Sequence, residues 1–161
     1  MPKFLLAKDT INGAEGSIFI TKDGRQYEVA SVKKVSATIN ILTEQMSVVG
    51  TRIKQEKPKG VEQKGKGTIY YGSNLFTDMV LDYSKNGQFP LFDMQITNED
   101  PATTLGRQTI VLYGCQLIGA IPIAILDSDE TMLNYDFEFS YTTAERLEKF
   151  KEPEILGGSS N

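Results

Sequence analysis

The sequence of 161 residues has no histidine, no tryptophan and a single cysteine. Without histidine the chain lacks the commonest general base and the commonest metal ligand, which excludes most hydrolytic triads. Cys115 lies in an apolar stretch with no second cysteine for a disulfide, so we expect a buried apolar side chain rather than a nucleophile. We therefore predict no catalytic residue, no metal site and no cofactor, and the chain is not expected to be an enzyme.

Long apolar runs are also missing. No stretch approaches the roughly 20 apolar residues that cross a bilayer, and the apolar run in residues 1–7 is too short for a signal peptide. The sequence therefore predicts no membrane association and a reducing, cytoplasmic site of synthesis.

A surplus of positive charge is lacking as well. The net charge of −4 argues against a dedicated DNA-binding protein, which needs excess Lys and Arg on its contact face. The charge is uneven: residues 1–66 carry 12 basic and 7 acidic side chains, whereas residues 93–138 carry 8 acidic side chains and one basic, Arg107. This pattern fits two interpretations, opposite potentials that dock copies of the chain together or an ordinary solvated surface.

Two segments resemble ligand sites only in composition. Asp127, Asp129 and Glu130 lack the spacing of a calcium-binding EF-hand loop, so a solvated turn is the better interpretation. The glycines of residues 60–67 are not followed by the Gly-Lys-Ser or Gly-Lys-Thr of a phosphate-binding loop.

What the sequence does contain is a period of two, typical of half-buried strands. Apolar and polar residues alternate over 133–141, 35–41 and 92–96, and Asp23-Gly24 between two apolar runs predicts a hairpin over 16–30. Residues 109–115 and 118–126 are expected to be core strands, bent where Gly114, Gly119 and Pro122 interrupt them. The length fits one domain, with a mainly β core over about 10–142.

Helical spacing occurs in one segment. Over residues 73–85 the apolar side chains form one stripe at helical spacing. Ser73 or Asn74 is the expected N-cap, and Asn86-Gly87 follows the expected end. We expect this helix to pack on the sheet, with a partner-binding helix as the alternative. A short helix is also expected over 144–150, before a mobile tail over 151–161.

Residues 50–66 are polar and basic, and they predict a long loop or an extended hairpin arm. Loops of this length in compact domains are usually either functional or disordered, and we treat the segment as a candidate subunit interface. The residues proposed for contact are Arg52, Lys54, Lys57, Pro58, Lys59 and Lys64.

An ordered set of motifs resembles a known family. The motifs are TINGAEG at 10–16, VVGTR at 48–52, KGKGTIYY at 64–71, DYSKNG at 82–87, GRQTIVLY at 106–113 and FEF at 137–139. Together they resemble the tail tube proteins of PBSX-type defective prophages and related contractile-tailed phages of Gram-positive bacteria. The resemblance covers approximately residues 10–142.

The resemblance implies a β-sandwich or partly closed β-barrel with one flanking helix. It also implies rings of six identical subunits, stacked into a hollow tube inside a contractile sheath, through which the genome passes without specific binding. The implied partners are further copies of the chain and the sheath, tape-measure and baseplate proteins, and the implied location is the virion tail, assembled in the bacterial cytoplasm.

Two hypotheses follow for individual residues. The arm over 50–66 is expected to contact a neighbouring subunit or the next ring, and to become ordered on assembly. Asp136 and Glu138, on the polar face of one strand, are expected to line the lumen and repel DNA phosphate. Two other functions stay open: the inner tube of a phage-derived bacteriocin or secretion-like particle, and a monomeric ligand-binding β-barrel.

Overall fold

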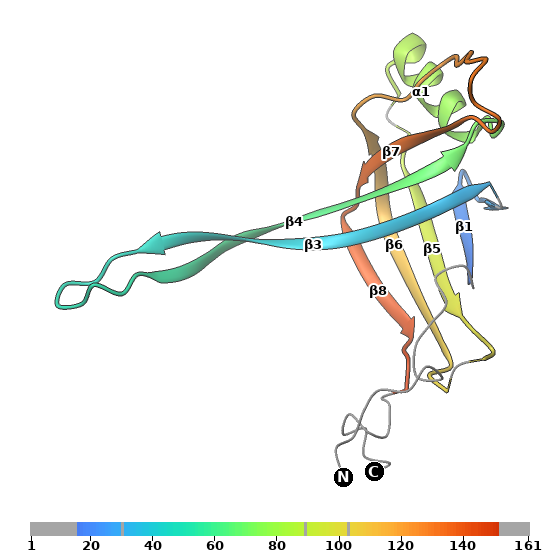
Figure 1. Cartoon of the computed structure of the whole chain (residues 1–161). Coiled ribbons are helices and arrows are strands. Elements are labelled where there is room, and N and C mark those ends of the chain that lie inside the picture. Colours follow the sequence, from blue (N-terminus) through green and yellow to red (C-terminus); the bar gives the residue numbers. More distant parts are fainter. Residues whose placement is uncertain (1–15, 30, 89, 103, 152–161) are drawn as a thin grey trace.

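The computed structural model describes residues 16–29, 31–88, 90–102 and 104–151. Within these ranges the chain forms eight strands and one helix (Figure 1). In chain order they are β1 (Gly16–Lys22), β2 (Arg25–Glu28), β3 (Val32–Met46), β4 (Gln55–Tyr70), α1 (Leu75–Asn86), β5 (Phe92–Glu99), β6 (Arg107–Ile118), β7 (Asn134–Ser140) and β8 (Thr143–Glu148). Residues 10–15 of the motif TINGAEG and residues 152–161 of the predicted tail lie outside the described residues.

The strands form one antiparallel sheet in the order β2-β1-β5-β6-β7-β4-β3, and β8 pairs with β6 beside this path. Strand β6 belongs to two layers, because its first half pairs with β8 and its last residues, Gln116 to Ile118, pair with β7. Between these halves Gly114 adopts a φ of 65°, a conformation that glycine takes without steric cost. The sheet folds over at this bend without closing, which confirms the predicted mainly β architecture with one flanking helix.

The first hairpin forms as predicted. Strands β1 and β2 pair from Lys22 opposite Arg25 onwards. The two turn residues, Asp23 and Gly24, have φ values of 53° and 76°. Positive φ at both central positions is the requirement of the tight turn whose twist matches that of the strands.

The predicted helix is also confirmed, as α1. It begins after Asn74 and ends at Gly87, whose N–H donates to the carbonyl of Tyr83 at 2.9 Å. Its buried residues are Phe76 and Met79, and the ring centroid of Phe76 lies 4.7 Å from the ring centroid of Phe137 on β7. The apolar stripe of the helix therefore packs on the sheet, as expected.

The core contains a close contact between glycine and phenylalanine. Strand β4 pairs with β7 so that Gly65 lies opposite Phe139 and Gly67 lies opposite Phe137. A Cβ atom at Gly65 would lie 2.7 Å from the Cε1 and Cε2 atoms of Phe139. The aromatic rings of β7 thus occupy the space that side chains on β4 would fill.

Two predicted elements are wrong. Residues 144–150 do not form a helix, because the chain pairs along the open edge of β6 as strand β8, where the backbone groups of β6 gain partners. Residues 118–126 do not continue as a strand beyond Ile118. Pro122 has no N–H for a sheet ladder, and Ile121 and Ile125 instead pack singly against the core.

Candidate interaction surface

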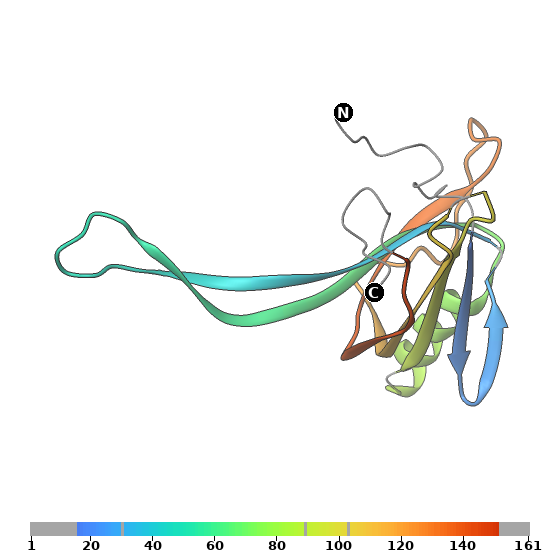
Figure 2. The same cartoon turned by 90° about the horizontal axis from the view of Figure 1, so that it is seen from below.

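A two-stranded hairpin projects from the body (Figures 1 and 2). Strand β4 pairs with β7 only from Lys64 to Tyr70, whereas β3 and β4 pair with each other out to Met46 opposite Gln55. We call residues 39–62 the arm. The predicted segment 50–66 therefore contributes the tip and the returning strand, and β3 is its partner.

The root of the arm is tied to the body. The hydroxyl of Tyr141 donates to the carbonyl of Thr38 at 2.8 Å, and the Tyr141 N–H donates to the carbonyl of Gln63 at 3.2 Å. The Thr38 hydroxyl donates to the carbonyl of Lys64 at 3.2 Å. These bonds fix the direction in which the arm leaves the sheet.

One face of the arm is apolar and uncovered. On β3 the core-facing side chains Val35 and Ala37 pack against the body. The same face continues outward to Ile39 and Ile41, with Val61 opposite Ile41, and these three side chains are 56%, 62% and 53% exposed. The period of two predicted the strand correctly, but its apolar face extends beyond the core. This exposed apolar stripe is therefore a candidate interaction surface.

The tip of the arm, residues 47–54, is apolar and basic. The N–H of Ile53 donates to the hydroxyl of Thr51 at 3.1 Å, which stabilises the turn. Val49 is fully exposed and Ile53 largely so. The sequence reasoning singled out the charges here and missed these apolar neighbours.

The proposed contact residues are all exposed but do not form one group. Arg52 and Lys54 lie at the tip. Lys57, Pro58 and Lys59 follow on β4, where the pairing steps from Leu42 opposite Gly60 to Thr43 opposite Pro58 and leaves Lys59 in a bulge. Lys64 lies at the root, opposite Ser140 on β7.

The proposed lumen residues lie on the polar face of β7. Asp136 accepts a 2.6 Å hydrogen bond from the hydroxyl of Thr68, and Glu138 lies opposite Lys66. Lys34 and Lys64 share this face, because Lys34 pairs with Thr68 and Lys64 with Ser140. The face is therefore of mixed charge, which the sequence did not reveal because the lysines come from other strands.

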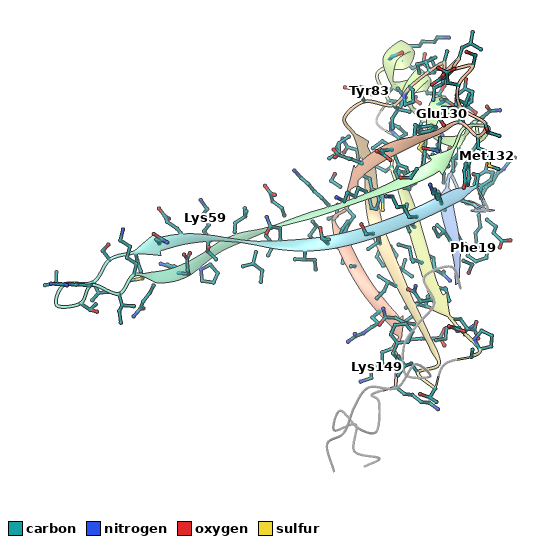
Figure 3. The ribbon with its side chains drawn as sticks, viewed as in Figure 1. Phe19, Lys59, Tyr83, Glu130, Met132 and Lys149 are labelled. Atoms are coloured by element: carbon teal, nitrogen blue, oxygen red, sulfur yellow. The ribbon has the colours of Figure 1, made fainter. Side chains whose placement is uncertain are left out.

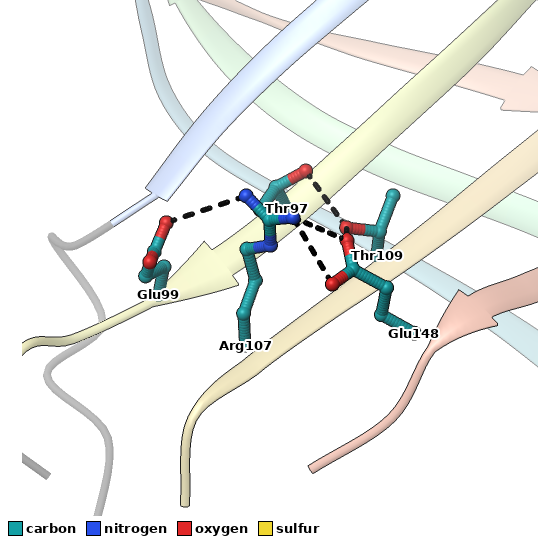
Figure 4. Close-up of polar contacts among 5 residues, drawn as sticks. All are labelled: Thr97, Glu99, Arg107, Thr109 and Glu148. Atoms are coloured by element: carbon teal, nitrogen blue, oxygen red, sulfur yellow. Dashed lines mark hydrogen bonds and ion pairs between the residues drawn. The ribbon is translucent and has the colours of Figure 1, made fainter.

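A polar cluster fastens β8 to β6 (Figure 4). The guanidinium of Arg107 lies 2.8 Å from the carboxylate of Glu148 and 3.8 Å from that of Glu99. The Thr109 hydroxyl also donates to Glu148 at 3.2 Å. The hydrogen bond from Arg107 lowers the pKa of Glu148, and the same bond raises the pKa of Arg107. The sequence signal was Arg107, the lone basic residue in an acidic stretch, but its partner lay 41 positions away.

Reactive groups are few in the described part of the chain. Cys115 is buried, and burial raises the pKa of its thiol to about 12, which confirms the expected buried apolar role. Asp127 caps a turn by accepting the N–H of Asp129 at 3.0 Å. Among the described residues there is no cluster of three metal-ligating side chains, and no helix long and apolar enough to cross a membrane.

Comparison with protein families gives a match over most of the chain. Residues 3–148 match the family model described as "Phage tail tube protein". The Phage-like element PBSX protein XkdM of Bacillus subtilis (strain 168) is 30% identical over 152 residues, which cover 94% of this chain and 96% of that protein.

Solved structures share the fold at low sequence identity. A chain of the anti-feeding prophage baseplate, 6-fold symmetrised, aligns with a TM-score of 0.61 and 12% identity, covering 91% of this chain and 97% of that one. A chain of the PVC sheath-tube complex, an extracellular contractile injection system in its extended state, aligns with a TM-score of 0.62 and 13% identity, covering 87% and 93%.

Proposed function

Because this chain belongs to the phage tail tube protein family, we propose that it polymerises with its own copies into stacked six-membered rings that form a hollow tube for DNA delivery. Family membership places the chain among the structural proteins of the virion tail. Its further partners in this proposal are the sheath, tape-measure and baseplate proteins, and assembly takes place in the cytoplasm of the bacterial host.

The observation that carries the proposal is the uncovered apolar face of the arm. Covering the exposed parts of Ile39, Ile41 and Val61 is worth on the order of 1 kcal/mol for each side chain. The outer part of β4 also presents a strand edge that β7 does not reach. A second copy of the chain supplies the apolar surface and the strand groups that this arm lacks.

Electron microscopy of the purified protein, with light scattering across concentration and salt, tests the proposal. Wild-type protein should form rings or tubes. A variant in which residues 43–59 are replaced by Asn-Gly should stay monomeric, because it lacks the outer part of the arm. The tight turn joins the paired residues Leu42 and Gly60 and leaves the body undisturbed. Equal assembly by the shortened variant would show that residues 43–59, the outer part of the arm, are not needed.

Trypsin reports the same contact residue by residue. The predicted contacts Arg52, Lys54 and Lys59 are exposed in the isolated chain and should be cut there. In the polymer the neighbouring subunit should protect them, so equal cleavage in monomer and polymer would refute the arm contact.

The polar face of β7 is proposed to line the lumen, with Asp136 and Glu138 offsetting the lysines that share it. A charge-balanced wall attracts DNA phosphate weakly, which lets the genome slide. Asp136→Asn combined with Glu138→Gln should make assembled tubes retain double-stranded DNA, with retention falling steeply as salt rises. No gain in DNA retention would remove this assignment.

A second candidate function is the inner tube of a phage-derived particle that carries no genome, because the chain shares its fold with a chain of an extracellular contractile injection system. Neighbouring capsid and terminase genes would favour the genome-delivering tail, and their absence would favour the particle. The third possibility, a monomeric ligand-binding barrel, is less favoured because the sheet is open and Phe76, Phe137 and Phe139 fill the interior.

A further inference from the structure

The tip of the arm has a counterpart elsewhere on the molecule. The segment between β6 and β7, residues 119–133, is held to the core by Ile121 and Ile125. Three of its other apolar side chains, Ile123, Leu126 and Met132, are at least half exposed. We call residues 119–133 the acidic loop.

The charges of the tip and the acidic loop are opposite and unmixed. Residues 47–54 contain Arg52 and Lys54 and no acid, whereas residues 119–133 contain Asp127, Asp129 and Glu130 and no base. All five side chains are exposed. Each surface therefore combines exposed apolar residues with charge of one sign, a pairing in which the apolar contact supplies affinity and the charges set the register.

The two surfaces of one molecule lie far apart. Figure 3 shows Lys59 out on the arm and Glu130 and Met132 at the opposite end of the body. The views of Figures 1 and 2 agree that the arm projects away from the acidic loop. A contact between them must therefore join two copies.

We propose that the arm tip of one copy docks on the acidic loop of another, with Val49 and Ile53 against Leu126 and Met132, and Arg52 and Lys54 against the carboxylates. The contact is heterologous, since it uses two different surfaces, and repetition of such a contact generates a ring or a helical filament. This pairing rests on the proposed self-assembly and names the surface that receives the arm.

Charge exchange tests the pairing. Arg52→Glu with Lys54→Glu gives an acidic tip, and Asp127→Lys with Asp129→Lys gives a basic loop. Each variant alone should give at least about tenfold less assembled protein in light scattering than wild type, because like charges then face each other. A mixture of the two, or one chain carrying all four changes, should recover assembly.

Arg25→Glu with Lys85→Glu is the matched control for the acidic tip, since it lowers the net charge by the same amount at positions on β2 and α1. It should assemble like wild type. If the two exchanged variants also assemble like wild type, or if combining them restores nothing, the pairing is wrong while wild-type tubes leave the proposed function intact.

Crosslinking measures the contact directly. Val49→Cys and Leu126→Cys are placed on fully exposed positions, and Cys115 is buried and does not compete. A mixture of the two single variants should crosslink as heterodimers with a short bismaleimide, and a chain with both cysteines should give a ladder of oligomers. Val49→Cys mixed with Tyr27→Cys, on β2, should not crosslink.

Absence of the heterodimer in assembling protein would overturn the pairing alone. If wild-type protein forms neither tubes nor larger species in light scattering, and the cysteine variants give no crosslink, then the proposed function and the pairing both fail.

Discussion

Replacing Gly65 by alanine should destabilise the body, although the same change usually favours a strand. Alanine normally gains about 0.5–1 kcal/mol over glycine inside a strand, because the unfolded glycine has more conformations to lose. At Gly65 the added methyl group would lie 2.7 Å from Cε1 and Cε2 of Phe139, well inside van der Waals contact.

The Phe139 ring has little room to move aside. It is fully buried, and its centroid lies 6.1 Å from that of Phe137 and 6.4 Å from that of Tyr141. Overpacking of this kind costs roughly 1–3 kcal/mol, and the enclosed ring argues for the upper end. Subtracting the usual gain leaves a net loss of about 2 kcal/mol, or roughly 4–8 °C in Tm for a chain of this size.

Urea unfolding of monomeric protein, followed by far-UV circular dichroism, measures this loss. The decisive comparison repeats Gly65→Ala in a Phe139→Leu background, where the ring is gone. Gly65→Ala should then show its usual stabilising effect of about 0.5–1 kcal/mol. The difference between the two backgrounds gives a coupling energy of about 3 kcal/mol between the two positions. An equal cost in both backgrounds, or a stabilising effect in the wild type, would refute the packing argument.

Three further predictions concern the edges of the sheet and the core. Because the pKa of Glu148 is lowered, its pair with Arg107 contributes its full stability at pH values above the ordinary carboxyl pKa of 4.5. That stability is lost as the pH falls through the lower pKa of the folded state. Glu148→Gln should therefore flatten the acid end of the profile of urea stability against pH. An unchanged profile would exclude the pair as a source of stability. Cys115 should resist alkylation by iodoacetamide at pH 8 in the folded chain and react once per chain in urea, whereas fast native reaction would contradict its burial. Tyr141→Phe removes the hydrogen bond to the Thr38 carbonyl, so it should lower the free energy of unfolding by about 0.5–1.5 kcal/mol and speed proteolysis of the arm. An unchanged free energy of unfolding would show that other contacts hold the root of the arm.

Local pattern was sufficient where one segment carries its own signal. The apolar stripe of α1 and its Gly87 end predicted that helix, because the spacing and the end residue lie within a few positions of each other. The expected side-chain N-cap is not formed, since the Asn74 side chain makes no capping hydrogen bond. The Asp23-Gly24 turn and the alternation of β7 were readable for the same reason. Pattern failed at residues 144–150, where an open edge of β6 selected a strand over a helix.

The sequence by itself determined the class of this protein: a mainly β chain without histidine, with a long basic segment and an ordered set of family motifs. Only the tertiary structure decided which apolar side chains reach the core. Ile39 and Ile41 have the alternation of buried residues, yet they lie on the part of β3 that extends beyond the core and are exposed. Burial depends on what packs against each face of the sheet. Cross-strand neighbours such as Lys66 and Glu138 depend on the pairing of β4 with β7, two strands that lie far apart in the sequence.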